Sequence, residues 1–66
     1  MTAYHVYRTD DTEVLNGDTI VDTQRNSYTY LCCVHPQRIH VRRQRETLAR
    51  DVPAGRFRLC IKEHTP

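Results

Sequence analysis

The chain has 66 residues, a net charge of +2 at pH 7 and a hydrophobic fraction of 38%. A length this far below the roughly 100–200 residues of a usual domain excludes a second domain, and the hydrophobic content excludes a disordered chain. No apolar run approaches the roughly 20 residues of a membrane-spanning helix, and the first residues lack the basic and apolar regions of a signal peptide. The sequence therefore predicts a single domain over residues 1–66, located in the cytoplasm and without membrane contact.

The charge is divided unevenly along the chain. Residues 1–33 hold two arginines against five acidic residues, which gives −3, whereas residues 34–66 hold eight basic residues against three acidic ones, which gives +5. Nine of the ten basic residues are arginine, whose planar fork of donors suits phosphate and carboxylate groups. This asymmetry predicts a basic surface for an acidic partner, unless the two halves neutralise each other in the folded domain.

Three short segments before residue 23 have strand composition. Residues 4–8 are rich in aromatic and β-branched residues, and a second short strand is expected at residues 14–15. Asn16-Gly17 is the dipeptide most typical of a two-residue hairpin, and it leads into a third strand at residues 18–22. Aspartates in the loops and turns of this region are expected to accept hydrogen bonds from nearby backbone N–H groups. They are Asp10, Asp11, Asp18 and Asp22.

The next expected strand is a continuous uncharged run. Residues 28–34 contain no charged side chain, which is typical of a central strand with both faces covered. Pro36 ends this strand because proline has no N–H group to donate to a neighbouring strand.

Two later segments alternate between hydrophobic and polar or basic residues. In residues 38–42, and again in residues 56–62, every second side chain is hydrophobic, which predicts strands with one buried face. The side chains expected to face the core are Ile39, Val41, Phe57, Leu59 and Ile61. Residues 43–51 between them could form a short helical turn, a loop or the continuation of a hairpin.

These segments together predict an all-β fold. Short strands separated by turn signals favour a five-stranded antiparallel meander or a half-open barrel, of the size of SH3-like and OB-like barrels. The alternative is a β-sheet that carries one short helix at residues 43–51. Because the core of so short a chain is marginal, we also expect a homo-oligomer.

The candidate binding site is a row of basic side chains on the two alternating segments. Its members are Arg38, His40, Arg42, Arg56, Arg58 and Lys62. If the two strands pair, these side chains form one positive face that can follow the phosphates of a nucleic acid. Tyr28 and Tyr30, on the preceding strand, would then offer rings for bases to stack on. Alternatively, the row is an ordinary solvated surface.

The cysteines and histidines offer weaker signals for chemistry. Cys33, His35, His40 and Cys60 are of the right types for zinc, but they lack the paired Cys-x2–4-Cys spacing of a zinc site. With Cys32, the cysteines are three in number, and buried free cysteines usually act as small hydrophobic residues. A Cys–His nucleophile pair is formally available, but so short a chain offers little scaffold for an active site. We therefore predict no metal, no cofactor and no enzymatic activity.

The sequence predicts a small regulatory protein that binds nucleic acid through its arginine-rich face. The alternative is an adaptor or inhibitor that docks on an acidic protein surface through arginine and tyrosine residues, in the manner of phage or mobile-element accessory proteins. The position of the tyrosines distinguishes the two functions. Rings beside the basic row favour base stacking, whereas rings on the opposite side favour a protein interface.

Overall fold

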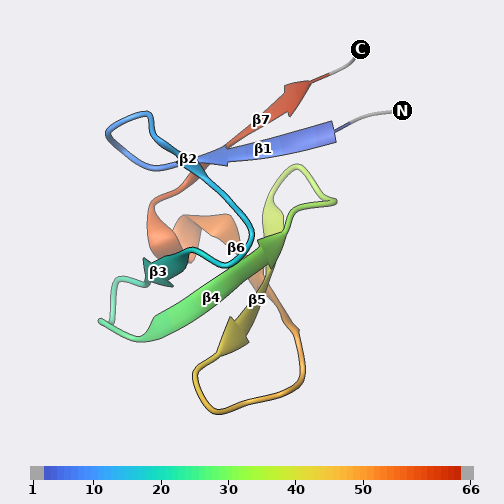
Figure 1. Cartoon of the computed structure of the whole chain (residues 1–66). Helices are drawn as coiled ribbons and strands as arrows, with labels where there is room; N and C mark the ends of the chain where they lie inside the picture. Colours follow the sequence, from blue (N-terminus) through green and yellow to red (C-terminus); the bar gives the residue numbers. More distant parts are fainter. Residues whose placement is uncertain (1–2, 65–66) are drawn as a thin grey trace.

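The computed structural model describes residues 3–64 and confirms the all-β class, with seven strands rather than five (Figure 1). The strands are β1 (Ala3–Tyr7), β2 (Glu13–Val14), β3 (Thr19–Val21), β4 (Ser27–Cys32), β5 (Arg38–Arg43), β6 (Arg50–Pro53) and β7 (Cys60–His64). A 3-10 helix, η1 (Ala54–Phe57), lies between β6 and β7. Within residues 3–64 no helix is long and apolar enough to cross a membrane.

The strands form two antiparallel sheets. The larger sheet has the order β3-β4-β5-β6, a simple meander, and the smaller one has the order β2-β1-β7. Figure 1 shows β1 and β7 side by side above the larger sheet, so the end of the described chain returns to its beginning. The prediction of a hairpin at Asn16-Gly17 is wrong, because β2 and β3 belong to different sheets and do not pair. Gly17, with φ of +93°, instead lets the chain turn from one sheet into the other, and its N–H donates to the Tyr30 carbonyl at 2.9 Å.

Of the three expectations for residues 43–51, a helical turn, a loop or the continuation of a hairpin, the structure agrees with the last. Residues 43–51 continue a hairpin, since β6 pairs with β5, so the expectation of a helical turn there is wrong. The strand expected at residues 56–62 begins only at Cys60. Its first residues lie in η1, and Arg58 ends that helix in the left-handed region with φ of 56°.

The hydrophobic core lies between the two sheets. Its buried residues are Val6, Val14, Ile20, Tyr28, Tyr30, Ile39, Val41, Val52, Ala54 and Phe57. The inward direction of Ile39 and Val41 is confirmed, and Phe57 reaches the core from η1 rather than from a strand. The Phe57 ring packs edge-on against the Tyr28 ring, with ring centroids 5.3 Å apart and an interplanar angle of 87°. Leu59 and Ile61 are partly buried against this core.

Strand β4 is central in its sheet, but only one of its faces is buried. Tyr28 and Tyr30 point into the core, whereas Thr29 is half-exposed and Cys32 is exposed. The expectation that both faces are covered is therefore wrong. A run of uncharged residues does not distinguish a two-sided strand from a one-sided strand whose outer face carries threonine and cysteine.

Aspartate side chains hold three of the turns. The Asp22 carboxylate accepts the backbone N–H groups of Gln24 and Asn26 at 2.8 and 2.9 Å, as expected from the sequence. Asp18 accepts the N–H of Leu15 at 2.9 Å, and Asp10 that of Thr12 at 3.1 Å. The Thr12 hydroxyl also donates to the Asp10 carboxylate, and this bond contributes most to the lowered pKa of Asp10. The backbone hydrogen bonds favour the ionised carboxylates as well and lower the pKa of all three aspartates.

The lowered pKa values predict a loss of stability in acid. Because the folded-state pKa of Asp10, Asp18 and Asp22 lies below the unfolded value of about 3.9, their contribution is complete above that pH. It is lost as the pH falls through the folded-state values, so we expect the Tm to decline below about pH 4. Asp22→Ala should weaken this decline relative to wild type.

Asp11→Asn is the control for acid unfolding, measured by circular dichroism melts from pH 7 to pH 2. Asp11 is exposed, and its carboxylate accepts no hydrogen bond from residues 3–64, so the expectation of a turn-stabilising role is wrong for this aspartate. A Tm that stays constant down to pH 2 would contradict the assignment of these turns.

Candidate anion-binding site

The basic row expected from the sequence is not a single face. Strand β5 pairs with β4 and β6, whereas β7 pairs with β1 in the other sheet, so the two basic segments do not pair. Arg38, His40 and Arg42 share the outer face of the larger sheet, opposite the buried Ile39 and Val41. The other three members lie elsewhere. They are Arg56 in η1, Arg58 directly after it, and Lys62 on β7.

Two members of the row also have partners within the domain. Arg38 Nε lies 3.1 Å from Asp51 Oδ2, and the same guanidinium donates to the Asp51 carbonyl at 3.0 Å. Lys62 Nζ lies 4.9 Å from the centroid of the Tyr7 ring, a cation–π contact. Arg38 is therefore already paired with a carboxylate and is a poor candidate for contact with a phosphate.

The two tyrosines proposed to stack on bases are core residues. Tyr28 is 6% exposed and Tyr30 is 5% exposed, and burial raises the pKa of Tyr30 to about 12. Their rings face away from the outer surface of the sheet, between the two sheets, so neither ring is available to a ligand. The proposed distinction between tyrosines beside the row and tyrosines opposite it therefore does not apply.

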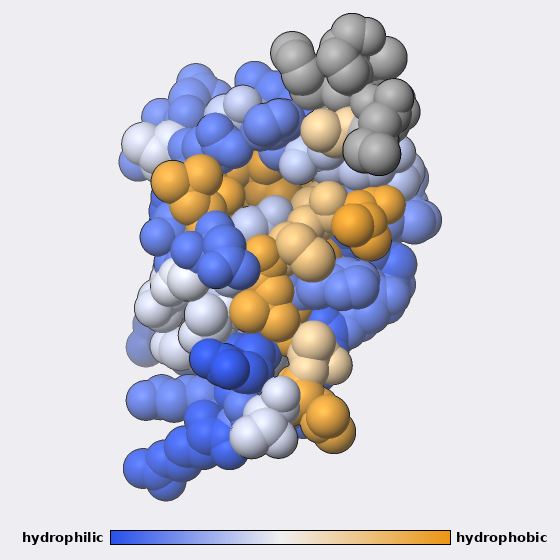
Figure 2. Space-filling model, turned by 45° about the vertical axis from the view of Figure 1, so that its right-hand side comes forward, coloured by the Kyte–Doolittle hydropathy of each residue, from blue (hydrophilic) through white to orange (hydrophobic). Residues whose placement is uncertain are grey.

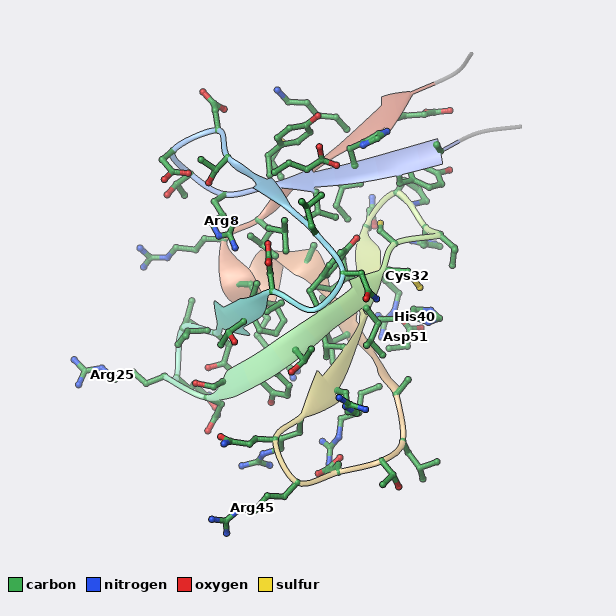
Figure 3. All side chains as sticks on the ribbon, viewed as in Figure 1. Arg8, Arg25, Cys32, His40, Arg45 and Asp51 are labelled. Carbon is green, nitrogen blue, oxygen red and sulfur yellow. The ribbon has the colours of Figure 1, made fainter. Side chains whose placement is uncertain are left out.

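The structure brings a different set of arginines together at one end of the larger sheet. The pairing of Tyr28 with Arg43 places the β3–β4 turn beside the β5–β6 turn. Between them lies a polar hollow of about 300 Å³, which we call the arginine hollow. Its lining residues are Arg25, Asn26, Ser27, Arg43, Gln44 and Arg45. Figure 3 shows Arg25 extending outward from the β3–β4 turn at the left and Arg45 extending outward from the β5–β6 turn at the bottom.

The arginine hollow is electrostatically unbalanced. Three arginines, two amide residues and one serine line it, and no aspartate or glutamate from residues 3–64 does so. Glu46, which follows Arg45 in the chain, accepts hydrogen bonds from Nη2 and Nε of Arg50 at 2.7 and 2.9 Å. Within the described residues, Arg25, Arg43 and Arg45 form no ion pair. The arrangement suits an oxyanion, since guanidinium forks bind phosphate oxygens in pairs.

Both turns hold an arginine in a backbone conformation that L-residues rarely adopt. Arg25 has φ of 68° and Arg45 has φ of 73°. Glycine or asparagine adopts this left-handed region at lower cost, by roughly 1 kcal/mol. Strained positions of this kind often coincide with functional sites. The sequence offered no periodic signal for Arg25 and Arg45, because both lie in segments with loop composition.

A thiol, an imidazole and a carboxylate are neighbours on the outer face of the same sheet. Cys32 lies opposite His40, and His40 lies opposite Asp51, on three neighbouring strands (Figure 3). Cys33, considered earlier beside His40, instead donates its thiol to the carbonyls of His35 and Arg38 at 3.1 and 3.4 Å. Within residues 3–64 no group of three His, Cys, Asp or Glu side chains is arranged to hold a metal ion.

The three thiols are expected to differ in reactivity. Burial raises the pKa of Cys33, so its reactive thiolate is less populated at a given pH, whereas Cys32 and Cys60 are exposed. We expect iodoacetamide at pH 8 to alkylate Cys33 more slowly than the other two. Fragmentation mass spectrometry of the quenched time points resolves the adjacent residues. Equal rates for Cys33 and Cys60 would contradict the position of the Cys33 side chain.

No protein-family model matches this chain, and no curated protein or solved structure is significantly similar to it.

Proposed function

We propose that the protein binds the phosphate backbone of nucleic acid through the arginine hollow. The observation that carries the proposal is that one hollow is lined by Arg25, Arg43 and Arg45, which form no ion pair within residues 3–64, and by no aspartate or glutamate of those residues. A lone phosphate would engage such a site, but a polyanion gains more, because several phosphates displace condensed counterions at once. The protein would act by occupying the nucleic acid, which is a regulatory rather than a catalytic role. Its three free thiols are compatible with a cytoplasmic location.

The charge distribution in the fold supports an oriented approach to a polyanion. The acidic residues Asp10 and Asp11 lie in the β1–β2 loop, next to the smaller sheet. Figure 1 shows that loop at the top of the view and the β5–β6 turn, which carries Arg45, at the bottom. Separation of charge across a small protein steers the basic end towards a negatively charged partner. Asp10 and Asp11 thus lie at the end of the domain away from Arg45.

Binding of a fluorescein-labelled single-stranded oligothymidylate, measured by anisotropy between 25 and 200 mM NaCl, tests the proposal. A single strand engaged by three arginines should show a slope of about −2 in log K against log salt, from roughly −0.7 per phosphate contact. These three arginines are Arg25, Arg43 and Arg45 of the arginine hollow. The absence of binding at about 50 mM salt would reject the proposal.

Exposed hydrophobic side chains favour the adaptor or inhibitor as a second candidate function. Leu15, Val21, Val34 and Leu48 are all more than half exposed. Figure 2 shows orange and tan residues in an interrupted stripe down one face of the molecule, among hydrophilic ones. An acidic protein partner could use these side chains together with the arginines. Copurification that survives nuclease treatment would favour this function, and copurification that nuclease abolishes would favour nucleic acid.

Self-association stays a prediction. In the structure the edge strands β3 and β6 of the larger sheet each pair with a single neighbour, and such edges can join two copies. Sedimentation at micromolar concentration checks it, and a fully folded monomer at that concentration would remove it.

A further inference from the structure

A groove runs along the edge of β3 and leads to the arginine hollow. One hollow of about 380 Å³ lies between β3 and the segment that joins η1 to β7, and a second of about 440 Å³ adjoins it. The two share Val21, Phe57 and Arg58, so they form one continuous groove. Each has a volume within the roughly 300–1,000 Å³ of typical small-ligand sites.

The lining of the groove combines apolar residues with arginines at its two ends and at the junction of its two hollows. Ile20 and Phe57 form a largely buried floor, and Val21, which is 51% exposed, forms a wall. Arg58 borders both hollows, and its position is fixed by its left-handed backbone at the end of η1. Arg8, at the far end, is held by Asp18 at 3.3 Å. Such a lining suits a ligand with a weakly polar body and negative charge beside it.

Arg25 connects the groove to the phosphate site. Its side chain lines both the second hollow of the groove and the arginine hollow. A phosphate held between Arg25 and Arg43 therefore lies next to the groove. In a nucleic acid, each phosphate is linked to a nucleoside, so a base is the group that would reach this groove.

We infer that the groove takes an unpaired nucleobase, so that the protein binds single-stranded rather than double-stranded nucleic acid. This inference rests on the proposed function, because the arginine hollow must hold the phosphate. Bases in a duplex are paired and stacked, and extruding one costs several kcal/mol, whereas bases in a single strand are free to enter. Apolar side chains and guanidinium planes such as those of Arg25 and Arg58 both pack against base faces.

An extended acidic peptide suits the groove less well. Such a peptide would add a strand to the free edge of β3, but β3 contains only three residues, Thr19–Val21. Directly after it, the Thr23 N–H already donates to the Arg56 carbonyl at 3.0 Å, which ties that edge to η1.

The test compares three probes of equal length on the full chain: a single-stranded thymidine decamer, a decamer of abasic deoxyribose phosphate, and a duplex decamer. We expect the thymidine decamer to bind about tenfold more tightly than the abasic chain, from one well-packed base. We expect the duplex to bind no better than the abasic chain. Equal binding of the thymidine and abasic decamers would overturn the inference and leave the proposed function standing. A duplex that binds as tightly as the thymidine decamer, or more tightly, would overturn the inference as well. If none of the three probes binds, the proposed function itself is rejected.

Matched variants locate the base. Val21→Ser should bring the affinity for the thymidine decamer close to that for the abasic chain, without changing the latter. Val34→Ser is the control, because Val34 is a similarly exposed valine (66%) that lies outside the groove. Arg58→Asn is a second groove variant, since asparagine tolerates the left-handed backbone, and circular dichroism verifies the fold of each. If both groove variants keep the wild-type preference for bases, or if decaglutamate competes as well as the thymidine decamer, the inference is overturned.

Discussion

Replacing Ile39 by alanine is expected to leave little folded protein at 37 °C. Ile39 is 0% exposed, lies in the central strand β5 and faces the core between the two sheets. Truncating a buried isoleucine to alanine costs about 2–5 kcal/mol, because the transferred surface is lost and a cavity remains. A 66-residue domain has only about 3–10 kcal/mol of stability, from roughly 0.05–0.15 kcal/mol per residue.

Urea unfolding at 25 °C measures the effect of Ile39→Ala, and Leu48→Ala is its control. Leu48 is 77% exposed in the β5–β6 turn, so the same kind of truncation should change the free energy of unfolding by less than about 0.5 kcal/mol. The Tm of Ile39→Ala should fall by at least about 10 °C. A loss of stability no larger than that of Leu48→Ala would mean that Ile39 does not lie in the core.

Replacing Arg43 and Arg45 together by glutamine is expected to abolish most nucleic-acid binding. The variant removes two of the three guanidinium groups of the arginine hollow and keeps side chains of comparable length and polarity. The salt slope should become shallower by about 1.4, from roughly 0.7 for each lost phosphate contact on a single strand. Affinity at 50 mM salt should fall at least about tenfold, since charge-assisted hydrogen bonds contribute about 1.5–3 kcal/mol each.

The control double variant, Arg42→Gln with Lys62→Gln, lowers the net charge equally but leaves the arginine hollow intact. Arg42 lies on the outer face of β5 and Lys62 on β7 in the other sheet, and both belong to the row expected from the sequence. We expect the control to keep most of the wild-type affinity. If both double variants weaken binding equally, net charge rather than the hollow determines the affinity. If only the control weakens it, the predicted row is the site after all.

The local alternation of hydrophobic and polar residues predicts which face of a strand is buried. It does not predict which other strand pairs with it. Alternation around Ile39 and Val41 identified the buried side of β5, because the pleat places every second side chain on one face. The similar alternation in residues 56–62 could not reveal that the chain first forms η1 and then pairs β7 with β1. Strand pairing depends on residues far apart in the chain, and a period of two residues is compatible with any partner.

Three features were predictable from the sequence alone: the all-β class, the hydrogen-bonding role of three of the four turn aspartates, and the excess of positive charge in the second half. Each follows from side-chain chemistry or spacing over a few residues, so it needs no knowledge of distant contacts. Only the tertiary structure decided which arginines share a site. Arg25 and Arg45 lie in separate turns, and the antiparallel pairing of β4 with β5 brings those turns to the same end of the sheet. Likewise, only the packing of the two sheets decided that Tyr28 and Tyr30 belong to the core, because in a domain this small the largest side chains are needed to fill it.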